Sequence, residues 1–134
     1  MLRLGKSRDS INVVADQFGC PTYAFHLADA IFSIVEQISN QKQDSAVWGI
    51  YHACGTGHAS WFDFAGEIFA QAKSLGRPAM KVNPITTAQY PTPARRPANS
   101  RLDCSKLDKT FAIRLPDWHA GTAQCVRALV DGRG

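Results

Sequence analysis

Apolar residues recur at three- and four-residue spacing in two long stretches of the chain. The first follows Thr22 and covers residues 24–38, and the second follows Ser60 and covers residues 61–72. This spacing places apolar side chains along one face of a helix. We therefore predict two amphipathic helices, the first N-capped by Thr22. The second has Ser60 as its N-cap and Asp63 at its third position, a variant of the capping box.

Shorter apolar runs without helical period predict strands over residues 11–14, 47–51 and 80–85, because they are rich in β-forming residues and end at turn signals. A short helix is expected over residues 105–109, and a terminal helix is expected to follow its cap, Asp117. The predicted order of strand, helix, strand, helix, strand, loop and helix is typical of an α/β fold.

The length of 134 residues predicts a single domain. Hydrophobic residues make up 45% and charged residues 19% of the chain, as in folded globular proteins. No apolar run is long enough for a membrane span, and the first ten residues lack the apolar core of a signal peptide. We expect no membrane association and a cytoplasmic location.

The formal charge of +4 raises the question of nucleic-acid binding, but the basic residues are scattered along the chain. The exception is a proline-bearing stretch, residues 86–102, which holds Arg95, Arg96 and Arg101 and contains no acidic residue. A local cluster of this kind suits one phosphate or diphosphate group better than a duplex. We therefore predict an ordered, ligand-binding loop and no nucleic-acid partner.

The four cysteines, Cys20, Cys54, Cys104 and Cys125, are far apart and form no C-x-x-C pair. We expect them to be reduced and structural. Cys54 and His58 lie in one predicted loop, but a tetrahedral metal site needs about four ligands and nothing nearby completes it. The sequence therefore predicts no metal site.

The stretch Gly55-x-Gly57-x-x-Ser60 imitates the dinucleotide-binding fingerprint between a predicted strand and a predicted helix. Its third glycine is replaced by Ser60, and no acidic residue follows about 20 positions later to bind a ribose. We favour a turn before a Ser-capped helix. A catalytic tyrosine with a lysine four residues later is also missing. The residues four places after Tyr23, Tyr51 and Tyr90 are Leu27, Gly55 and Ala94.

Four stretches in combination resemble the dTDP-4-dehydrorhamnose reductases, members of the extended short-chain dehydrogenase group. They are VVADQFGCPT with LAD behind it (13–22 and 27–29), GIYH with SWFDFA (49–52 and 60–65), YPTPARRPANSRLD (90–103) and LPDW (115–118). The resemblance covers nearly the whole chain. It implies the C-terminal portion of an extended short-chain dehydrogenase fold, with the last Rossmann strands and helices and a small substrate-binding lobe.

The family reduces dTDP-4-dehydro-6-deoxy-L-mannose to dTDP-L-rhamnose with NADPH or NADH. The resemblance implies that residues 1–134 form one sugar-nucleotide-binding domain or fragment, without the N-terminal Rossmann half that holds the cofactor and the Tyr-x-x-x-Lys pair. We therefore expect no catalytic residue, no cofactor for this chain alone, and a dTDP-sugar as its ligand. The candidate substrate-binding residues are Gln17, Pro21, Thr22, Arg96, Asn99, Ser100 and Arg101.

Some family members join their dimers through a metal held by acidic residues, at positions where Phe25 and His119 stand in this chain. This departure argues against a metal-linked dimer. A homo-oligomer is still expected, because the missing half would leave the edge of the predicted strand at residues 47–51 unpaired and the helix faces uncovered. Two other functions remain open. One is a non-catalytic nucleotide-sugar-binding or interaction module, and the other is a mononucleotide-binding domain built on residues 55–60.

Overall fold

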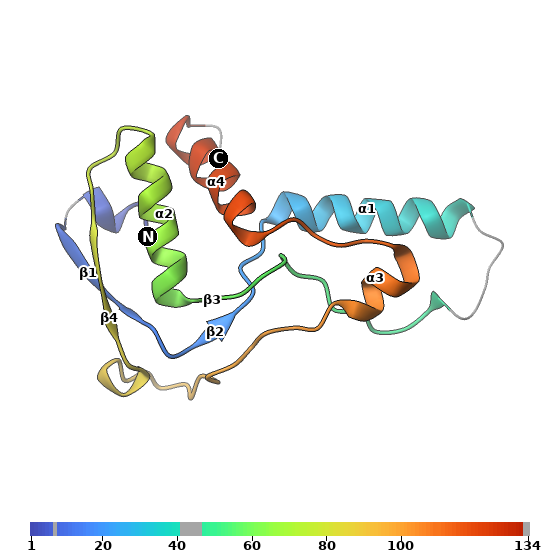
Figure 1. The fold of residues 1–134 in the computed structure, drawn as a ribbon, viewed down its shortest axis with the longest axis horizontal. Helices are drawn as coiled ribbons and strands as arrows, with labels where there is room; N and C mark the ends of the chain where they lie inside the picture. The colour runs from blue at the N-terminus through green and yellow to red at the C-terminus, as the bar shows by residue number, and fades with distance from the viewer. Residues whose placement is uncertain (7, 41–46, 133–134) are drawn as a thin grey trace.

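Two strands that are distant in the sequence pair in parallel at one end of the molecule (Figure 1). They are β1 (Ser10–Val14) and β4 (Lys81–Ile85), in a register that runs from Ser10 opposite Lys81 to Val14 opposite Ile85. The computed structural model describes residues 1–6, 8–40 and 47–132. Both strands were predicted from their apolar runs, and the mixed α/β class is confirmed.

Helix α2 (Trp61–Ser74) packs on this pair of strands, and α4 (Trp118–Val130) packs on α2 (Figure 1). The first contact buries residues of β1 and α2, namely Ile11, Val13, Ala65 and Phe69. The second buries Ile68, Ala72 and Val126. The predicted capping box is confirmed, since the amide of Ser60 donates to Asp63 and the amide of Asp63 donates to the Ser60 hydroxyl.

The other end of the molecule is formed by α1 (Ala24–Asn40) and α3 (Ser105–Phe111) (Figure 1). Their contact is an apolar cluster whose buried members are Ala30, Leu107, Phe111 and Leu115. The helices were predicted, but the cap of the first was wrong. The helix begins at Ala24, two residues after Thr22, and the Thr22 hydroxyl instead donates to the backbone oxygen of Cys20 at 3.0 Å and accepts the amide of Gly55 at 3.1 Å.

The strand predicted over residues 47–51 is not formed. Within the described ranges no strand pairs with this segment, and a strand without a partner leaves its backbone hydrogen bonds unmade. The side chains of Trp48 and Ile50 are 62% and 83% exposed, whereas Val47 and Tyr51 pack on the cluster between α1 and α3. The strand prediction was wrong because it relied on a neighbour that this chain does not supply.

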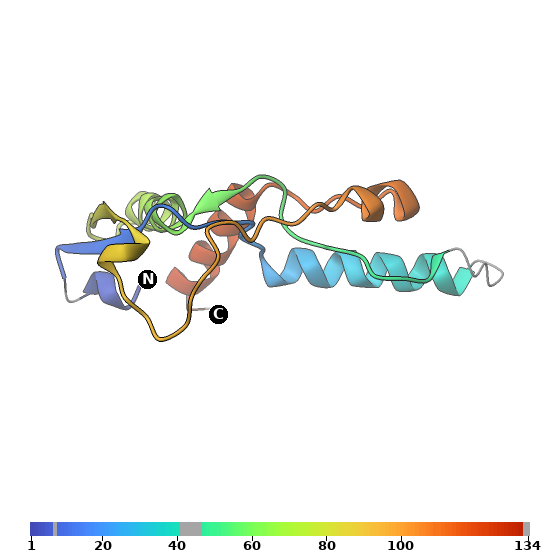
Figure 2. The same ribbon diagram turned by 90° about the horizontal axis from the view of Figure 1, so that it is seen from below.

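Two short strands join the ends of the molecule. They are β2 (Phe18–Gly19) and β3 (Ala59–Ser60), and they pair antiparallel. Two 3-10 turns flank the strand pair, η1 (Leu4–Lys6) before β1 and η3 (Thr87–Gln89) after β4. After η3 the chain swings out and returns past β2 to α3, as the turned view shows (Figure 2). No helix among the described residues is long and apolar enough to span a bilayer.

Candidate functional site

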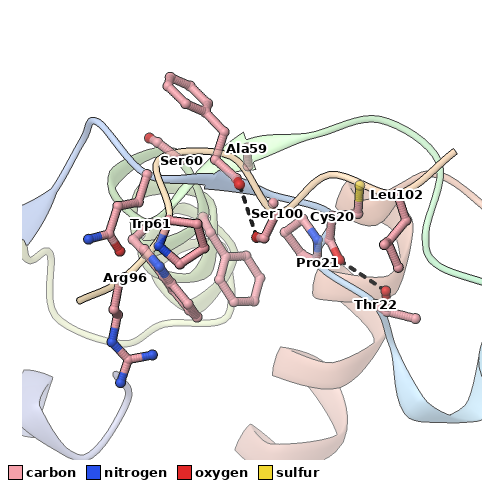
Figure 3. A pocket seen from close by; sticks show the side chains of 14 residues that line it. Cys20, Pro21, Thr22, Ala59, Ser60, Trp61, Arg96, Ser100 and Leu102 are labelled. Carbon is pink, nitrogen blue, oxygen red and sulfur yellow. Dashed lines mark hydrogen bonds between the residues drawn. The ribbon is translucent and has the colours of Figure 1, made fainter. Parts of the chain in front are cut away.

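A hollow of about 490 Å³ lies where three segments of the chain meet (Figure 3). Its first wall is the segment of residues 17–22, which carries β2. Its second wall is formed by β3 and the first turn of α2, residues 59–64. Its third wall comes from residues 96–102, part of the acid-free stretch recognised in the sequence. We call residues 95–102 the arginine segment.

Hydrogen bonds to Thr87 in η3 hold the start of the first wall. Thr87 donates its amide and its hydroxyl to the Asp16 carboxylate, with the hydroxyl at 2.6 Å, and the side-chain amide of buried Gln17 donates to the Thr87 hydroxyl at 3.1 Å. The hydroxyl bond from Thr87, followed by its amide bond, lowers the pKa of Asp16 below the ordinary value. Asp16 therefore stays ionised and fixes the wall's position.

The end of the first wall is fixed by a close backbone contact. Gly55 lies so near Pro21 that a Cβ atom at Gly55 would come within 2.4 Å of the Pro21 backbone oxygen. A side chain at this position is therefore excluded. Together with the bond from the Gly55 amide to the Thr22 hydroxyl, this contact sets Pro21 and Thr22 against the loop before β3.

Aromatic rings form the second wall. The side chain of Trp61 is 50% exposed and lies with its ring centroid 6.5 Å from that of Phe64. Phe64 in turn contacts the buried Trp118 edge-on, at 6.1 Å. The capping box at Ser60 fixes where α2 begins, and therefore where these two rings point. This wall offers an apolar face to a flat ring of a ligand.

Backbone hydrogen bonds connect the arginine segment to β2. The amide of Phe18 donates to Ala98 at 2.9 Å, and the amide of Ser100 donates to the Phe18 oxygen at 2.8 Å. These bonds surround the bridge between Phe18 and Asn99. The segment is therefore an ordered wall, as predicted for the acid-free stretch.

One positively charged side chain, that of Arg96, lies at one end of the hollow. Arg96 lies there beside Trp61, while Thr22 and Leu102 lie at the other end (Figure 3). In the part of the chain that the structure describes, Arg96 makes no ion pair with a carboxylate, and the same is true of Arg95 and Arg101. An arginine without an acidic partner at the rim of a hollow can bind an anion with two parallel hydrogen bonds.

The structure brings together five of the seven residues predicted to bind a ligand. The hollow is lined by Gln17, Pro21, Thr22, Arg96 and Ser100. The remaining two, Asn99 and Arg101, do not line it. They contact each other instead, since the backbone amide and the side-chain Nε of Arg101 donate to the Asn99 side-chain oxygen at 3.1 and 2.9 Å.

Several residues that line the hollow were not predicted from the sequence. Five of them are large apolar residues: Phe18, Trp61, Phe64, Pro97 and Leu102. Trp61 and Phe64 were assigned to the apolar face of a helix, which was correct for the helix but did not show that the face also borders a hollow. The only available signal was the position of Trp61 in the first turn, where a helix face extends beyond its core contacts.

The turn at residues 55–60 does not fit a cofactor diphosphate. Three of its backbone amides already have partners: Gly55 donates to Thr22, Thr56 donates to the oxygen of Pro116, and Ser60 donates to Asp63. The Asp63 carboxylate also lies at the helix N-terminus, where a phosphate would have to bind. Gly57 has φ +87°, as expected for a turn glycine. The geometry supports the turn interpretation.

The positions compared with a dimer-bridging metal site hold no ligand cluster. Phe25 is 67% exposed, and His119 Nδ1 lies 2.7 Å from Asp117 Oδ1. The pKa of Asp117 is lowered, first by the amide of His119 and then by its ring. Within the described residues, no three His, Cys, Asp or Glu side chains are grouped so that they could hold a metal ion. Asp117 caps α4, as predicted.

Comparison with known proteins gives one consistent result. The family model described as the RmlD substrate binding domain matches residues 1–130. A dTDP-4-dehydrorhamnose reductase from Sinorhizobium fredii is 47% identical over 131 residues, which are 97% of this chain and 44% of that protein. A dTDP-4-dehydrorhamnose reductase from Escherichia coli K12 is 42% identical over 131 residues, covering 96% of this chain and 43% of that protein.

Solved structures agree with these relatives. A dTDP-4-dehydrorhamnose reductase ortholog from Clostridium acetobutylicum matches with a TM-score of 0.82 and 32% identity, over 96% of this chain and 42% of that one. The reductase from Bacillus anthracis, solved in complex with NADP, matches with a TM-score of 0.78 and 33% identity, over 92% of this chain and 40% of that one. The chain thus spans less than half the length of the relatives it matches.

Proposed function

The chain belongs to the RmlD substrate binding domain family, and we propose that it forms the nucleotide-sugar-binding part of a dTDP-4-dehydrorhamnose reductase. The proposed ligand is dTDP-4-dehydro-6-deoxy-L-mannose or the product of its reduction, dTDP-L-rhamnose. The reduction adds a hydride to the C4 carbonyl carbon of the sugar and a proton to its oxygen. In this proposal the chain contributes the surface that holds and orients the nucleotide sugar.

The proposal rests mainly on the position and the surroundings of the Arg96 side chain. Its guanidinium lies at the end of the hollow and, within the described part of the chain, has no carboxylate partner. A diphosphate offers paired oxygens that match the fork of a guanidinium. Arg95 and Arg101 lie in the same acid-free stretch and add positive potential without lining the hollow. We therefore assign the diphosphate of the nucleotide sugar to Arg96.

The walls beside Arg96 suit the remainder of such a ligand. Trp61 and Phe64 offer aromatic surface on which a pyrimidine ring can stack, and the half-exposed Trp61 lies directly beside Arg96 (Figure 3). The hydroxyl groups of Thr22 and Ser100 also line the hollow. Each donates to a backbone oxygen and keeps a lone pair that can accept a hydrogen bond from a hydroxyl group of a sugar. A charged end, an aromatic wall and a hydroxyl-bearing end together support a nucleoside diphosphate sugar.

The hydride and the proton are proposed to come from an N-terminal Rossmann half outside this chain. Such a half would bind NADPH or NADH, the hydride donor, and would carry the Tyr-x-x-x-Lys pair. Two observations support this division. None of the three tyrosines has a lysine four residues later, and the amides of Gly55 and Ser60, at the two ends of the turn, are engaged within the chain. We propose that the chain alone is inactive.

We also propose that apolar surface on α1 is covered by that N-terminal half or by a second copy of the chain. Phe25, Phe32 and Val35 on α1 are 67%, 69% and 53% exposed, and Trp48 is 62% exposed. Several large apolar side chains exposed on one helix commonly mark an interface. The four cysteines are free, which supports the cytoplasm as the location because its thiols are kept reduced.

Calorimetric titration of the chain with dTDP-L-rhamnose tests the proposal. We expect binding, and we expect thymidine, which lacks the diphosphate, to bind at least about 10-fold more weakly because charge-assisted hydrogen bonds are lost. Absence of binding by a chain whose circular dichroism shows folded helices would refute the proposed ligand. Mixing the chain with the N-terminal half of the Sinorhizobium fredii relative then separates the two roles. Restored NADPH oxidation supports an enzyme part, and binding without it favours a non-catalytic module.

A further inference from the structure

Three of the four cysteines converge behind the hollow. The Sγ atoms of Cys54 and Cys104 lie 3.4 Å apart, although 50 positions separate the two residues. Cys20, which lines the hollow, is also near enough to Cys54 to raise the pKa of its thiol. Cys54 is buried, whereas Cys20 and Cys104 are partly exposed. Neither the family assignment nor the proposed ligand accounts for this cluster.

We propose that Cys54 and Cys104 form a redox-modification site at which a hydroperoxide converts the two thiols into a disulfide. Cys20 is a third thiol beside Cys54, and it competes with Cys104 for a disulfide with Cys54. The site does not depend on the nucleotide-sugar ligand, so a test of the disulfide is independent of a test of the proposed function.

The geometry needs only a small adjustment. A disulfide joins its sulfur atoms at about 2.05 Å, so the two Sγ atoms must approach by roughly 1.4 Å. Cys104 is the residue before α3, and its side chain makes no capping hydrogen bond to that helix. Cys54 lies outside any helix or strand. Both side chains can therefore turn toward each other without breaking a helix.

The chemistry balances with one hydroperoxide. The Cys104 thiolate attacks a peroxide oxygen, the O–O bond breaks, and the departing oxygen takes up a proton to leave as water when the oxidant is hydrogen peroxide. Cys104 is then a sulfenic acid. The Cys54 sulfur attacks the Cys104 sulfur, the S–O bond breaks, and the hydroxide leaves as a second water with the proton of Cys54. Two thiols are oxidised and one peroxide is reduced.

The order of the two steps follows from burial. Burial is the largest cause of the raised pKa of Cys54, and hydrogen bonds from Cys104 and Cys20 add to it. A thiol that resists deprotonation is a poor first nucleophile toward a peroxide. Cys104 is partly exposed and meets the oxidant first. Cys54, held 3.4 Å away, then acts as the resolving thiol.

The disulfide would tie the end of the arginine segment to the loop behind the first wall. Cys104 lies two residues after Leu102, which lines the hollow, and Cys54 precedes Gly55, whose amide donates to Thr22. Oxidation would therefore fix two walls of the hollow relative to each other. It would also restrict the unfolded chain, which raises thermal stability.

Peptide mapping tests the assignment. The reduced chain is treated with hydrogen peroxide, its remaining thiols are blocked, and it is digested with trypsin. The spacing of lysine and arginine places each of the four cysteines in a different tryptic peptide. We expect the peptide of Cys54 linked to that of Cys104, two thiols lost of the four, and a melting temperature raised by about 5 to 10 °C.

Matched variants keep the test decisive. Cys104→Ser should abolish the linked peptide and the rise in melting temperature, whereas Cys125→Ser, at a cysteine outside the cluster, should keep both. Four free thiols after excess peroxide would overturn the proposal. So would a link from Cys20 to either partner as the main product, links between two chains, or sulfinic acid at Cys104 with Cys54 left as a thiol.

Discussion

The hydroxyl and the backbone amide of Ser100 both donate to the backbone oxygen of Phe18, at 3.1 and 2.8 Å, across 82 positions of sequence. This double contact sets the arginine segment against β2 and so places the third wall of the hollow. Gly19 lies just beside it, and a Cβ atom there would come 3.0 Å from the Ser100 hydroxyl. The position of Arg96 therefore depends on how firmly Ser100 is held.

Replacing Ser100 by alanine removes one of these two bonds and leaves the amide bond in place. We expect the free energy of unfolding to fall by about 1 kcal/mol or less, and the Kd for dTDP-L-rhamnose to rise about 2- to 5-fold because the third wall loosens. Urea denaturation and calorimetry measure the two effects. Ser74→Ala is the control, because its hydroxyl also donates to a backbone oxygen, that of Gln71, on the surface of α2. Equal affinities of both variants would contradict the role of Ser100.

We predict that the stability of the fold depends on pH through the carboxylate of Asp16. Its pKa in the folded chain is lowered below 3.8 by the hydroxyl and the amide of Thr87. A lowered folded pKa means that the carboxylate stabilises the fold above the unfolded value and that this contribution is lost as the pH falls through the folded pKa. Wild type should therefore melt above Asp16→Asn at pH 7, and the difference should shrink as the pH falls below 3.8. A difference that is the same at pH 2 and pH 7 would show that Asp16 does not act through its charge.

The chain alone is predicted not to bind NADPH tightly. The amides of Gly55 and Ser60 already donate to Thr22 and Asp63, and the Asp63 carboxylate repels a diphosphate at the start of α2. Calorimetric titration with NADPH should show no binding in the micromolar range. A Kd of micromolar size would mean that this turn can reopen, and it would overturn the division of labour proposed for the two halves.

Self-association is predicted from the exposed apolar face of α1. Phe32 is 69% exposed there, and burying it in a second copy removes apolar surface from water. Light scattering over a dilution series should show a dimer that dissociates on dilution, and Phe32→Glu should shift the equilibrium to the monomer. Ser74→Glu, an equal charge at an exposed polar position of α2, away from this face, should leave it unchanged. A wild-type chain that stays monomeric at high micromolar concentration would show that the fragment is self-sufficient.

Features with a local cause could be predicted from the sequence. The capping box at Ser60 and Asp63 depends on residues three positions apart, and it was predicted together with the helix that follows it. Features with a distant cause could not. Residues 47–51 have the composition of a strand, but a strand also needs a neighbour to pair with, and composition does not show whether that neighbour is present.

The candidate site shows the same division. Arg96 was found because its stretch lacks acids, which is visible in the sequence, and Gln17 and Thr22 were found through the family resemblance. Trp61 was assigned to a helix face, because helical period identifies the face and not what lies opposite it. The proximity of Cys54 and Cys104 was also missed, since their spacing in sequence gives no sign that the fold brings their sulfur atoms together.

The most direct test of the proposed function is the affinity of three proteins for dTDP-L-rhamnose: wild type, Arg96→Ala and Arg8→Ala. Arg8 precedes β1, whereas the hollow begins beyond the other end of that strand, so its loss changes the net charge equally without touching the hollow. Arg96→Ala should weaken binding by about 1.5 to 3 kcal/mol, on the order of 10- to 150-fold in Kd, and Arg8→Ala should leave it nearly unchanged. An unchanged Kd for Arg96→Ala, with a lowered melting temperature instead, would show that Arg96 only pins the loop, and it would contradict the assignment of the diphosphate to this residue.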